Sequence, residues 1–249
     1  MENMKHSIWT YKSLKVAYYP ELDGDGTNQA ASFVKFIKER FPGKKFHRVF
    51  EWCSGPGFIG FALLKEGIAE KLCLADVNPL AIECIKKTVS ENGLSECVTY
   101  YISDNLKGIP KSEKFDLVVA NPPNYYALNP DNQAGKNLIG DLRPNDPGWK
   151  LHKEFYKEIG SFLNQEAYLL VEEVEPLKKI VYNSASDIIP YDIRNEVPIE
   201  DFKKMIKEGN LEYIGTEHFH SAFDRMYSRG AIMKEVVHKL YLVISKNRK

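Results

Sequence analysis

A glycine-rich turn is the first segment of this sequence whose residues could do chemistry. It reads EWCSGPGFIG over residues 51–60 and lies between an apolar run and a helical pattern. Glycine has no side chain, so the backbone at Gly55 and Gly57 can pass close beneath a bound ligand. A tight turn that needs glycine only for its own geometry is the alternative, but the position after a strand favours a ligand site.

Two carboxylates accompany this turn. Asp76 ends the next predicted strand, where it can accept hydrogen bonds from both hydroxyls of a ribose. Nicotinamide dinucleotides and S-adenosylmethionine both carry such a ribose. Glu51 favours S-adenosylmethionine, because a carboxylate repels a pyrophosphate and attracts the ammonium and sulfonium groups of that molecule.

A third acid, Asp104, follows the next predicted strand along the chain. Its carboxylate can accept a hydrogen bond from an adenine amino group, and a turn or a helix cap is the alternative. The three acids would thus bind three parts of one nucleoside cofactor.

The segment FDLVVANPPN, residues 115–124, places Asn121 and two prolines directly after an apolar run. Consecutive prolines fix the backbone and cannot extend a strand, so Asn121 should be held at the strand tip. The amide oxygen of Asn121 and the carbonyl of Pro122 can accept hydrogen bonds from an NH2 group, which aligns the nitrogen lone pair with a sulfonium methyl. A rigid turn without function is the alternative, but the other motifs occupy the matching strand ends.

From about residue 49 to residue 171, the chain resembles the class I S-adenosylmethionine-dependent methyltransferases that carry an Asn-Pro-Pro-aromatic motif. These include release-factor glutamine methyltransferases and N6-adenine methyltransferases, and the motifs occur here in the family's order. The resemblance implies that Asn121 and Pro122 position the target nitrogen. The predicted cofactor-binding set is Glu51, Cys53, Gly55, Gly57, Asp76, Val77, Asn78, Asp104, Asn105 and Asn121.

One position departs from the family's motif. The fourth residue, aromatic in those families and used to stack a planar substrate, is Asn124 in this chain. We expect Tyr125 or Tyr126 to supply the missing ring, and we include Tyr125 among the catalytic residues. Anchoring of the following loop is the alternative role for these tyrosines.

Alternating strands and helices must position these motifs. The sequence predicts strands at 48–52, 71–75, 98–102, 115–120, 167–171, 211–219 and 239–245, and helices at 29–40, 58–66, 79–92, 149–163 and 199–208. This order implies a Rossmann-like, doubly wound, mostly parallel seven-stranded sheet, the class I methyltransferase fold. Such sheets bind ligands at the carboxyl ends of their strands, where all the motifs fall.

The length of the chain suits a single globular unit. We expect residues 1–47 to form a lead-in with one helix and residues 48–249 to form the Rossmann-like domain. The loop 124–148 is predicted to be a lid that is ordered by substrate. An insertion at 221–237 is a candidate for substrate selection.

Composition limits the choice of substrate. Lys and Arg number 34 and Asp and Glu also number 34, so the chain has no global basic field of the kind that attracts nucleic acid. We therefore predict methyl transfer to an amide, amine or guanidine-like nitrogen of a small molecule or a protein side chain. Methylation of an RNA or DNA base is the runner-up, and a non-catalytic cofactor-binding protein is the third alternative.

The remaining expectations concern location and metals. No apolar run reaches the roughly 20 residues that a membrane span needs, and the N-terminal segment lacks the apolar region of a signal peptide. We expect a soluble, cytoplasmic protein without a membrane partner. The four cysteines show no metal-binding spacing, so reduced thiols and no metal site are predicted.

Overall fold

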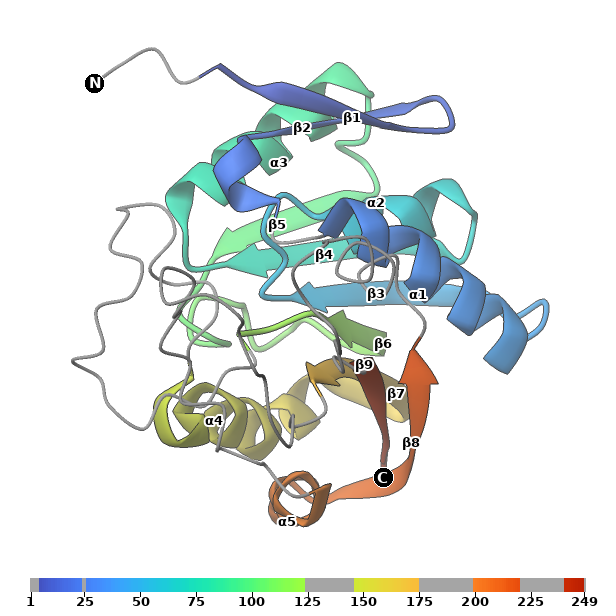
Figure 1. Ribbon diagram of the computed structural model, residues 1–249, viewed down its shortest axis with the longest axis vertical. Helices are drawn as coiled ribbons and strands as arrows, with labels where there is room; N and C mark the ends of the chain where they lie inside the picture. The colour runs from blue at the N-terminus through green and yellow to red at the C-terminus, as the bar shows by residue number, and fades with distance from the viewer. Residues whose placement is uncertain (1–4, 24–25, 124–145, 175–198, 220–239, 249) are drawn as a thin grey trace, which may run out of the picture.

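A seven-stranded sheet forms the centre of the protein (Figure 1). The structure, a computed structural model, describes residues 5–23, 26–123, 146–174, 199–219 and 240–248. The strand order is β5-β4-β3-β6-β7-β9-β8. The bounds are β3 (Phe46–Trp52), β4 (Ala69–Asp76), β5 (Val98–Ile102), β6 (Phe115–Ala120), β7 (Leu163–Val174), β8 (Leu211–Phe219) and β9 (Leu240–Asn247).

Strand direction confirms the expected Rossmann-like sheet. Neighbouring strands from β5 through β7 are parallel, whereas β9 runs antiparallel to both β7 and β8. In the parallel part, the carboxyl ends of β3, β4, β5, β6 and β7 therefore meet at one edge of the sheet. This carboxyl edge carries the glycine turn, Asp76 and Asn121.

Helices cover both faces of the sheet (Figure 1). On one face, α1 (Gly26–Arg40), α2 (Phe58–Lys65) and α3 (Pro79–Glu91) enclose one apolar core. On the other, α4 (Lys150–Ile159) and α5 (Ile199–Glu208) enclose a second core that contains Trp52 and Phe155. The strands that bear the motifs are thus buried on both sides and hold their carboxyl ends rigidly.

The N-terminal segment contains a hairpin that the sequence analysis missed. Strands β1 (Ser7–Tyr11) and β2 (Leu14–Tyr18) pair antiparallel, and β2 packs on α3 through a 2.9 Å hydrogen bond from the Ala17 amide to Oγ1 of Thr88. The expectation of one helix in residues 1–47 was therefore incomplete. Each strand is only five residues long. Polar residues are interspersed with the apolar ones that face α2 and α3, which obscures the strand pattern in the sequence.

Several predicted boundaries were also wrong, including the starts of β7 and α1, which are Leu163 and Gly26 rather than Ala167 and Gln29. Strand β7 continues three residues past the predicted end at Val171, because the carboxylates of Glu172 and Glu173 are buried rather than exposed at a strand end. Helix α4 ends at Ile159, and a short 3-10 turn (Gly160–Phe162) leads into β7.

Most of the predicted lid and all of the predicted insertion lie outside the described residues. These segments are residues 124–145 of the loop and residues 221–237. Within the described chain, no helix is both long enough and apolar enough to cross a membrane.

Candidate functional site

The glycine turn joins β3 to α2 with a backbone that ordinary side chains disfavour. Gly55 has φ of 52° and Gly57 has φ of 86°, both in the left-handed region. A Cβ on Gly57 would come within 2.8 Å of the Leu74 side chain. Both space and backbone conformation therefore require glycine at position 57.

Glu51 lies directly behind this turn. Its side chain is buried, and its Oε2 accepts a 2.7 Å hydrogen bond from the amide of Gly60 at the start of α2. Burial raises the pKa of Glu51 to about 8, although the backbone amides of Gly60 and Ile59 oppose this shift. A Cβ on Gly60 would lie only 2.7 Å from the same Oε2, so glycine at position 60 makes room for the acid.

Asp76 ends β4 and is bonded to the same turn. Its Oδ2 accepts a 2.7 Å hydrogen bond from the amide of Gly55, and its Oδ1 accepts a 2.8 Å hydrogen bond from the amide of Asn78. Burial raises the pKa of Asp76, and the hydrogen bonds from backbone amides only partly offset this. The aspartate predicted for the ribose and the glycines predicted for close approach thus form one hydrogen-bonded unit.

The acidic side chains of this site fit S-adenosylmethionine. Each carboxylate oxygen has two lone pairs, so Glu51 and Asp76 can accept further hydrogen bonds beside those from the backbone. In the described part of the chain, no Lys or Arg pairs with either acid, so an ammonium or sulfonium that binds beside them meets no competing cation. Val77 and Ile102, 47% and 59% exposed at the ends of β4 and β5, offer an apolar surface for a base.

Other predicted cofactor residues have structural partners of their own. Asn78 caps α3, since its Oδ1 accepts a 3.0 Å hydrogen bond from the Leu80 amide. The exposed carboxylate of Asp104 forms an ion pair with Lys107 at 2.5 Å. Cys53 is half-buried in the turn, and its removal from solvent together with the negative charges of Asp76 and Asp146 raises the pKa of its thiol well above the ordinary value.

Asn105 is buried and connects the end of β5 to α4. Its Nδ2 donates a 3.0 Å hydrogen bond to the carbonyl of Leu151. Its Oδ1 is buried and has no hydrogen-bond partner among the described residues. This amide oxygen can therefore accept a hydrogen bond from a ligand at the carboxyl edge.

Asn121 follows Ala120, the last residue of β6. Ala120 pairs with Trp52 of β3 on one side and with Val171 of β7 on the other, so Asn121 leaves the sheet beside the glycine turn. Asn121 is half-buried and Pro122 is buried. Tyr125, the third predicted catalytic residue, lies outside the described residues.

The sequence analysis missed a buried cluster at the same edge. Nδ1 of His152 lies 2.6 Å from Oδ2 of Asp146, and Nε2 of His152 lies 3.0 Å from Oε1 of Glu173. Burial alone lowers the pKa of His152, but the carboxylates of Glu173 and Asp146 outweigh it and raise the pKa to about 9. The signal in the sequence was the pair of acids at 172–173, directly after an apolar run.

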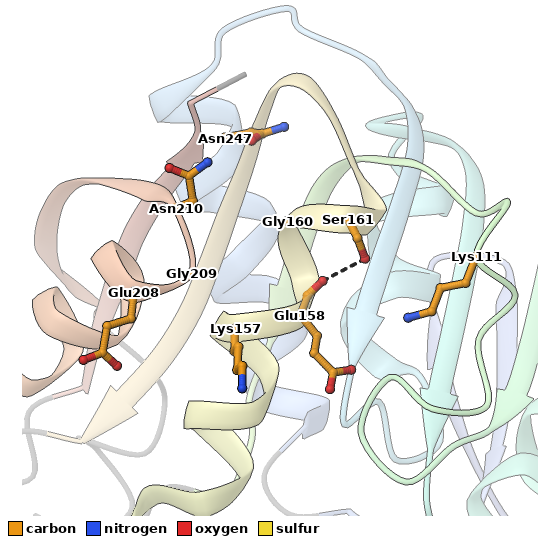
Figure 2. A pocket seen from close by; sticks show the side chains of 9 residues that line it. All are labelled: Lys111, Lys157, Glu158, Gly160, Ser161, Glu208, Gly209, Asn210 and Asn247. Carbon is orange, nitrogen blue, oxygen red and sulfur yellow. Dashed lines mark hydrogen bonds between the residues drawn. The ribbon is translucent and has the colours of Figure 1, made fainter.

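Two further observations delimit the site. The described residues contain no group of three or more His, Cys, Asp or Glu side chains that could hold a metal ion. A hollow of about 320 Å³ is lined by Lys111, Lys157 and Glu208 among others, and Figure 2 shows these side chains. This hollow lies where β7 and β8 begin, at the opposite edge of the sheet from Asp76 and Asn121, so it is separate from the site.

Comparison with known proteins identifies the domain that carries this site. Residues 30–143 match the family model described as the methyltransferase small domain. The ribosomal RNA small subunit methyltransferase C of Actinobacillus pleuropneumoniae is 32% identical over 123 residues, which are 49% of this chain and 34% of the relative. The release factor glutamine methyltransferase of Leptospira interrogans is 29% identical over 197 residues, 76% of this chain and 67% of the relative.

Solved structures share the fold at low sequence identity. A putative transferase from Pyrococcus horikoshii has a TM-score of 0.57 at 15% identity, covering 99% of this chain and 74% of its own. M. jannaschii TYW2 in complex with AdoMet has a TM-score of 0.55 at 15% identity, covering 99% and 87%.

These matches confirm the predicted resemblance to class I methyltransferases and the Rossmann-like fold, and they support S-adenosylmethionine as the cofactor. The chain spans only about a third of the length of the ribosomal RNA relatives, 34% for the one described above.

Proposed function

We propose, on the premise that residues 30–143 form a methyltransferase small domain, that this protein is an S-adenosylmethionine-dependent N-methyltransferase. The acceptor is an amide, amine or guanidine-like nitrogen of a small molecule or a protein side chain. One observation carries the proposal: Asn121 and Pro122 leave the sheet next to the strand that bears Glu51 and the glycine turn.

In this proposal the acids and the glycine turn bind the cofactor. Glu51 faces its ammonium and sulfonium charges, Asp76 accepts from the ribose hydroxyls, and Val77 contacts the base. The bound cofactor supplies an electrophilic methyl group. Because Asp76 is bonded to Gly55, binding of the ribose also fixes the turn.

Asn121 and Pro122 orient the acceptor. The side-chain oxygen of Asn121 and the carbonyl of Pro122 accept the two N–H bonds of an NH2 group, so that the nitrogen lone pair points away from them toward the methyl group. An amide nitrogen is a poor nucleophile, so this alignment must supply much of the rate acceleration. The release factor glutamine methyltransferases among the relatives favour an amide nitrogen.

A nucleic-acid base is the second candidate acceptor. It is favoured by the relatives named ribosomal RNA small subunit methyltransferase C, one of which matches over 123 residues, 49% of this chain. The balanced charge of this chain argues against it, since phosphate contacts require an excess of basic groups.

Methyl transfer from labelled S-adenosylmethionine tests the proposal. The protein is incubated with the labelled cofactor and separate pools of metabolites, proteins and RNA, and the modified atom is identified by mass spectrometry. We expect N-methylation in the metabolite or protein pool, and labelling slowed by roughly 10²–10³ with Asn121→Ala. Labelling of RNA alone would select the second candidate, and transfer only to oxygen or carbon, or to no pool, would contradict the proposal.

A further inference from the structure

The proposed chemistry makes no use of Asp146, His152 and Glu173, which form the buried array at the carboxyl edge. Their side chains are 2%, 0% and 4% exposed. A neutral imidazole has a single N–H, yet both ring nitrogens of His152 face a carboxylate oxygen. Nδ1 is hydrogen-bonded to Asp146, whereas Nε2 and Oε1 of Glu173 are within ion-pair distance but outside hydrogen-bond geometry. An imidazolium between two carboxylates gives both contacts opposite charges.

The array connects two segments that are distant in sequence. Asp146 precedes α4 and caps it, since its carboxylate accepts hydrogen bonds from the amides of Leu151 at 2.8 Å and His152 at 3.0 Å. Glu173 lies on β7 two residues beyond Val171, which pairs with Ala120. Asn121 follows Ala120, so the array joins the start of α4 to the strand that flanks Asn121.

Aromatic rings extend this connection to the cofactor strand. The indole of Trp52 meets the His152 ring edge-on at 5.4 Å and stacks on Phe155 at 3.8 Å. Trp52 is the last residue of β3 and directly precedes the glycine turn. The Trp149 ring contacts His152 from another side at 4.8 Å. The imidazole is therefore packed against the strands of both halves of the site.

We propose that the Asp146–His152–Glu173 array is a positioning site for the acceptor nitrogen, in which the His152 cation holds α4 against the end of β7 and thereby fixes Asn121 relative to the glycine turn. This inference rests on the proposed function for the meaning of the acceptor site. His152 acts through Asn121, without contact to the reacting atoms.

Loss of the His152 proton would loosen the array. Asp146 and Glu173 would then be two buried carboxylates without a cation between them, which repel each other in a medium that screens poorly. Among the described residues, the other ionisable groups that face the array are Tyr156 from α4 and Cys53 directly after β3, and both are neutral at ordinary pH. Helix α5 contributes only the uncharged ring of Phe202. Hence no second cation among these groups can replace His152.

Nitrogen NMR of the histidine side chains in the full chain tests the array directly. We expect His152, assigned by the signal lost in His152→Gln, to remain protonated up to about pH 9. Glu173→Gln removes one carboxylate of nearly equal size and should lower the midpoint by about 1–3 pH units. Glu158→Gln, the same change on the exposed side of α4, is the matched control and should leave the midpoint in place. A midpoint near the ordinary value of about 6.5 in the wild-type protein would overturn the proposal.

The backbone amide signal of Asn121 tests the coupling without turnover. We expect it to shift with the His152 midpoint in the wild-type protein and with the lowered midpoint in Glu173→Gln. An Asn121 signal that does not follow His152 would overturn the positioning role even if the enzyme methylates nitrogen. In single-turnover transfer, the alkaline fall in rate should move by the same amount in Glu173→Gln, with cofactor affinity unchanged. If the transfer rate fell at the same alkaline pH in wild type and Glu173→Gln, the positioning role would also be overturned. Absence of transfer in every pool would instead refute the proposed function, and the two NMR tests would then decide on the array.

Discussion

The amide of Gly55 donates a 2.7 Å hydrogen bond to the carboxylate of Asp76. The first residue belongs to the turn after β3 and the second ends β4, so this bond ties together the carboxyl ends of two neighbouring strands. On the other side of the turn, the carboxylate of Glu51 in β3 accepts from the amide of Gly60 and so ties the strand to α2. The cofactor site is therefore prearranged by its own acids before any ligand binds.

The buried acid Glu51 should make the stability of the cofactor-free protein depend on pH. The unfolded chain releases this proton near pH 4.5, whereas the folded protein keeps it up to about pH 8. Since the unfolded state then binds fewer protons, the free energy of unfolding falls as pH rises between these values. Glu51→Gln, which stays neutral, should be more stable than wild type at pH 8 by on the order of 2–4 kcal/mol, and about equally stable at pH 4.

Urea unfolding at pH 4, 6 and 8 measures this difference. The predicted gain comes at the cost of cofactor affinity, because Glu51 can ionise when the ammonium and sulfonium groups bind beside it, whereas Gln cannot. A difference in stability that stays the same at all three pH values would show that Glu51 is already ionised in the folded protein.

The second acid with a strong effect on stability is Glu66, which lies outside the site. It closes α2 and accepts from Tyr11 at 2.8 Å, while Lys12 and Lys38 form ion pairs with it at 2.8 and 2.6 Å. Burial opposes ionisation, but these contacts outweigh it and lower the pKa of Glu66 to about 2. The contribution of ionised Glu66 to the free energy of unfolding is therefore complete above pH 4.5 and is lost as pH falls toward 2.

Glu66→Gln should lower the free energy of unfolding at pH 7 by about 1–2 kcal/mol, a value reduced because both lysines are half-exposed to solvent. The loss should shrink at pH 3. Glu91→Gln removes an exposed ion pair with Lys87 on α3 and serves as the control, with an expected change below about 0.5 kcal/mol. Equal effects of the two substitutions in chemical denaturation would argue against the hairpin–helix connection through Glu66.

The proposed acceptor residue should affect chemistry rather than cofactor binding. Loss of one preorganised hydrogen bond at a reacting centre typically costs roughly 10²–10³ in rate, so Asn121→Ala should lower kcat by that factor and leave cofactor affinity unchanged. Asn164→Ala is the control, because it removes a hydrogen bond to Asp116 at the opposite end of β6. Single-turnover transfer at saturating cofactor measures both variants, and near wild-type transfer by Asn121→Ala would remove the case for nitrogen positioning.

Much of the fold could be predicted because local signals agree with it. The apolar runs at 71–75 and 115–120 became parallel strands, and the Pro79 start and the Asn92-Gly93 stop bounded a helix. Glycine and proline mark the ends of these elements in the sequence itself. The glycine turn, Asp76 and Asn121 fell on one edge because every parallel strand contributes its carboxyl end there.

The array around His152 could not be predicted because it depends on strand register. Glu173 was expected to lie beyond the strand, since a carboxylate normally ends a buried run. Its burial is tolerated because His152, on a helix, faces it across the second core. The N-terminal hairpin escaped prediction for a similar reason, because its partners are Thr88 on α3 and Asn92, the residue that caps the end of α3.

Calorimetric titration of the cofactor-free protein with S-adenosylmethionine tests the central claim most directly. We expect one site per chain, with no comparable binding of a nicotinamide dinucleotide. Asp76→Ala should weaken binding by roughly 1.5–3 kcal/mol, the range for a hydrogen bond to a charged group, and Asn121→Ala should bind as the wild type does. Equal affinity of wild type and Asp76→Ala, or preference for the dinucleotide, would contradict the assignment of this edge of the sheet as the S-adenosylmethionine site.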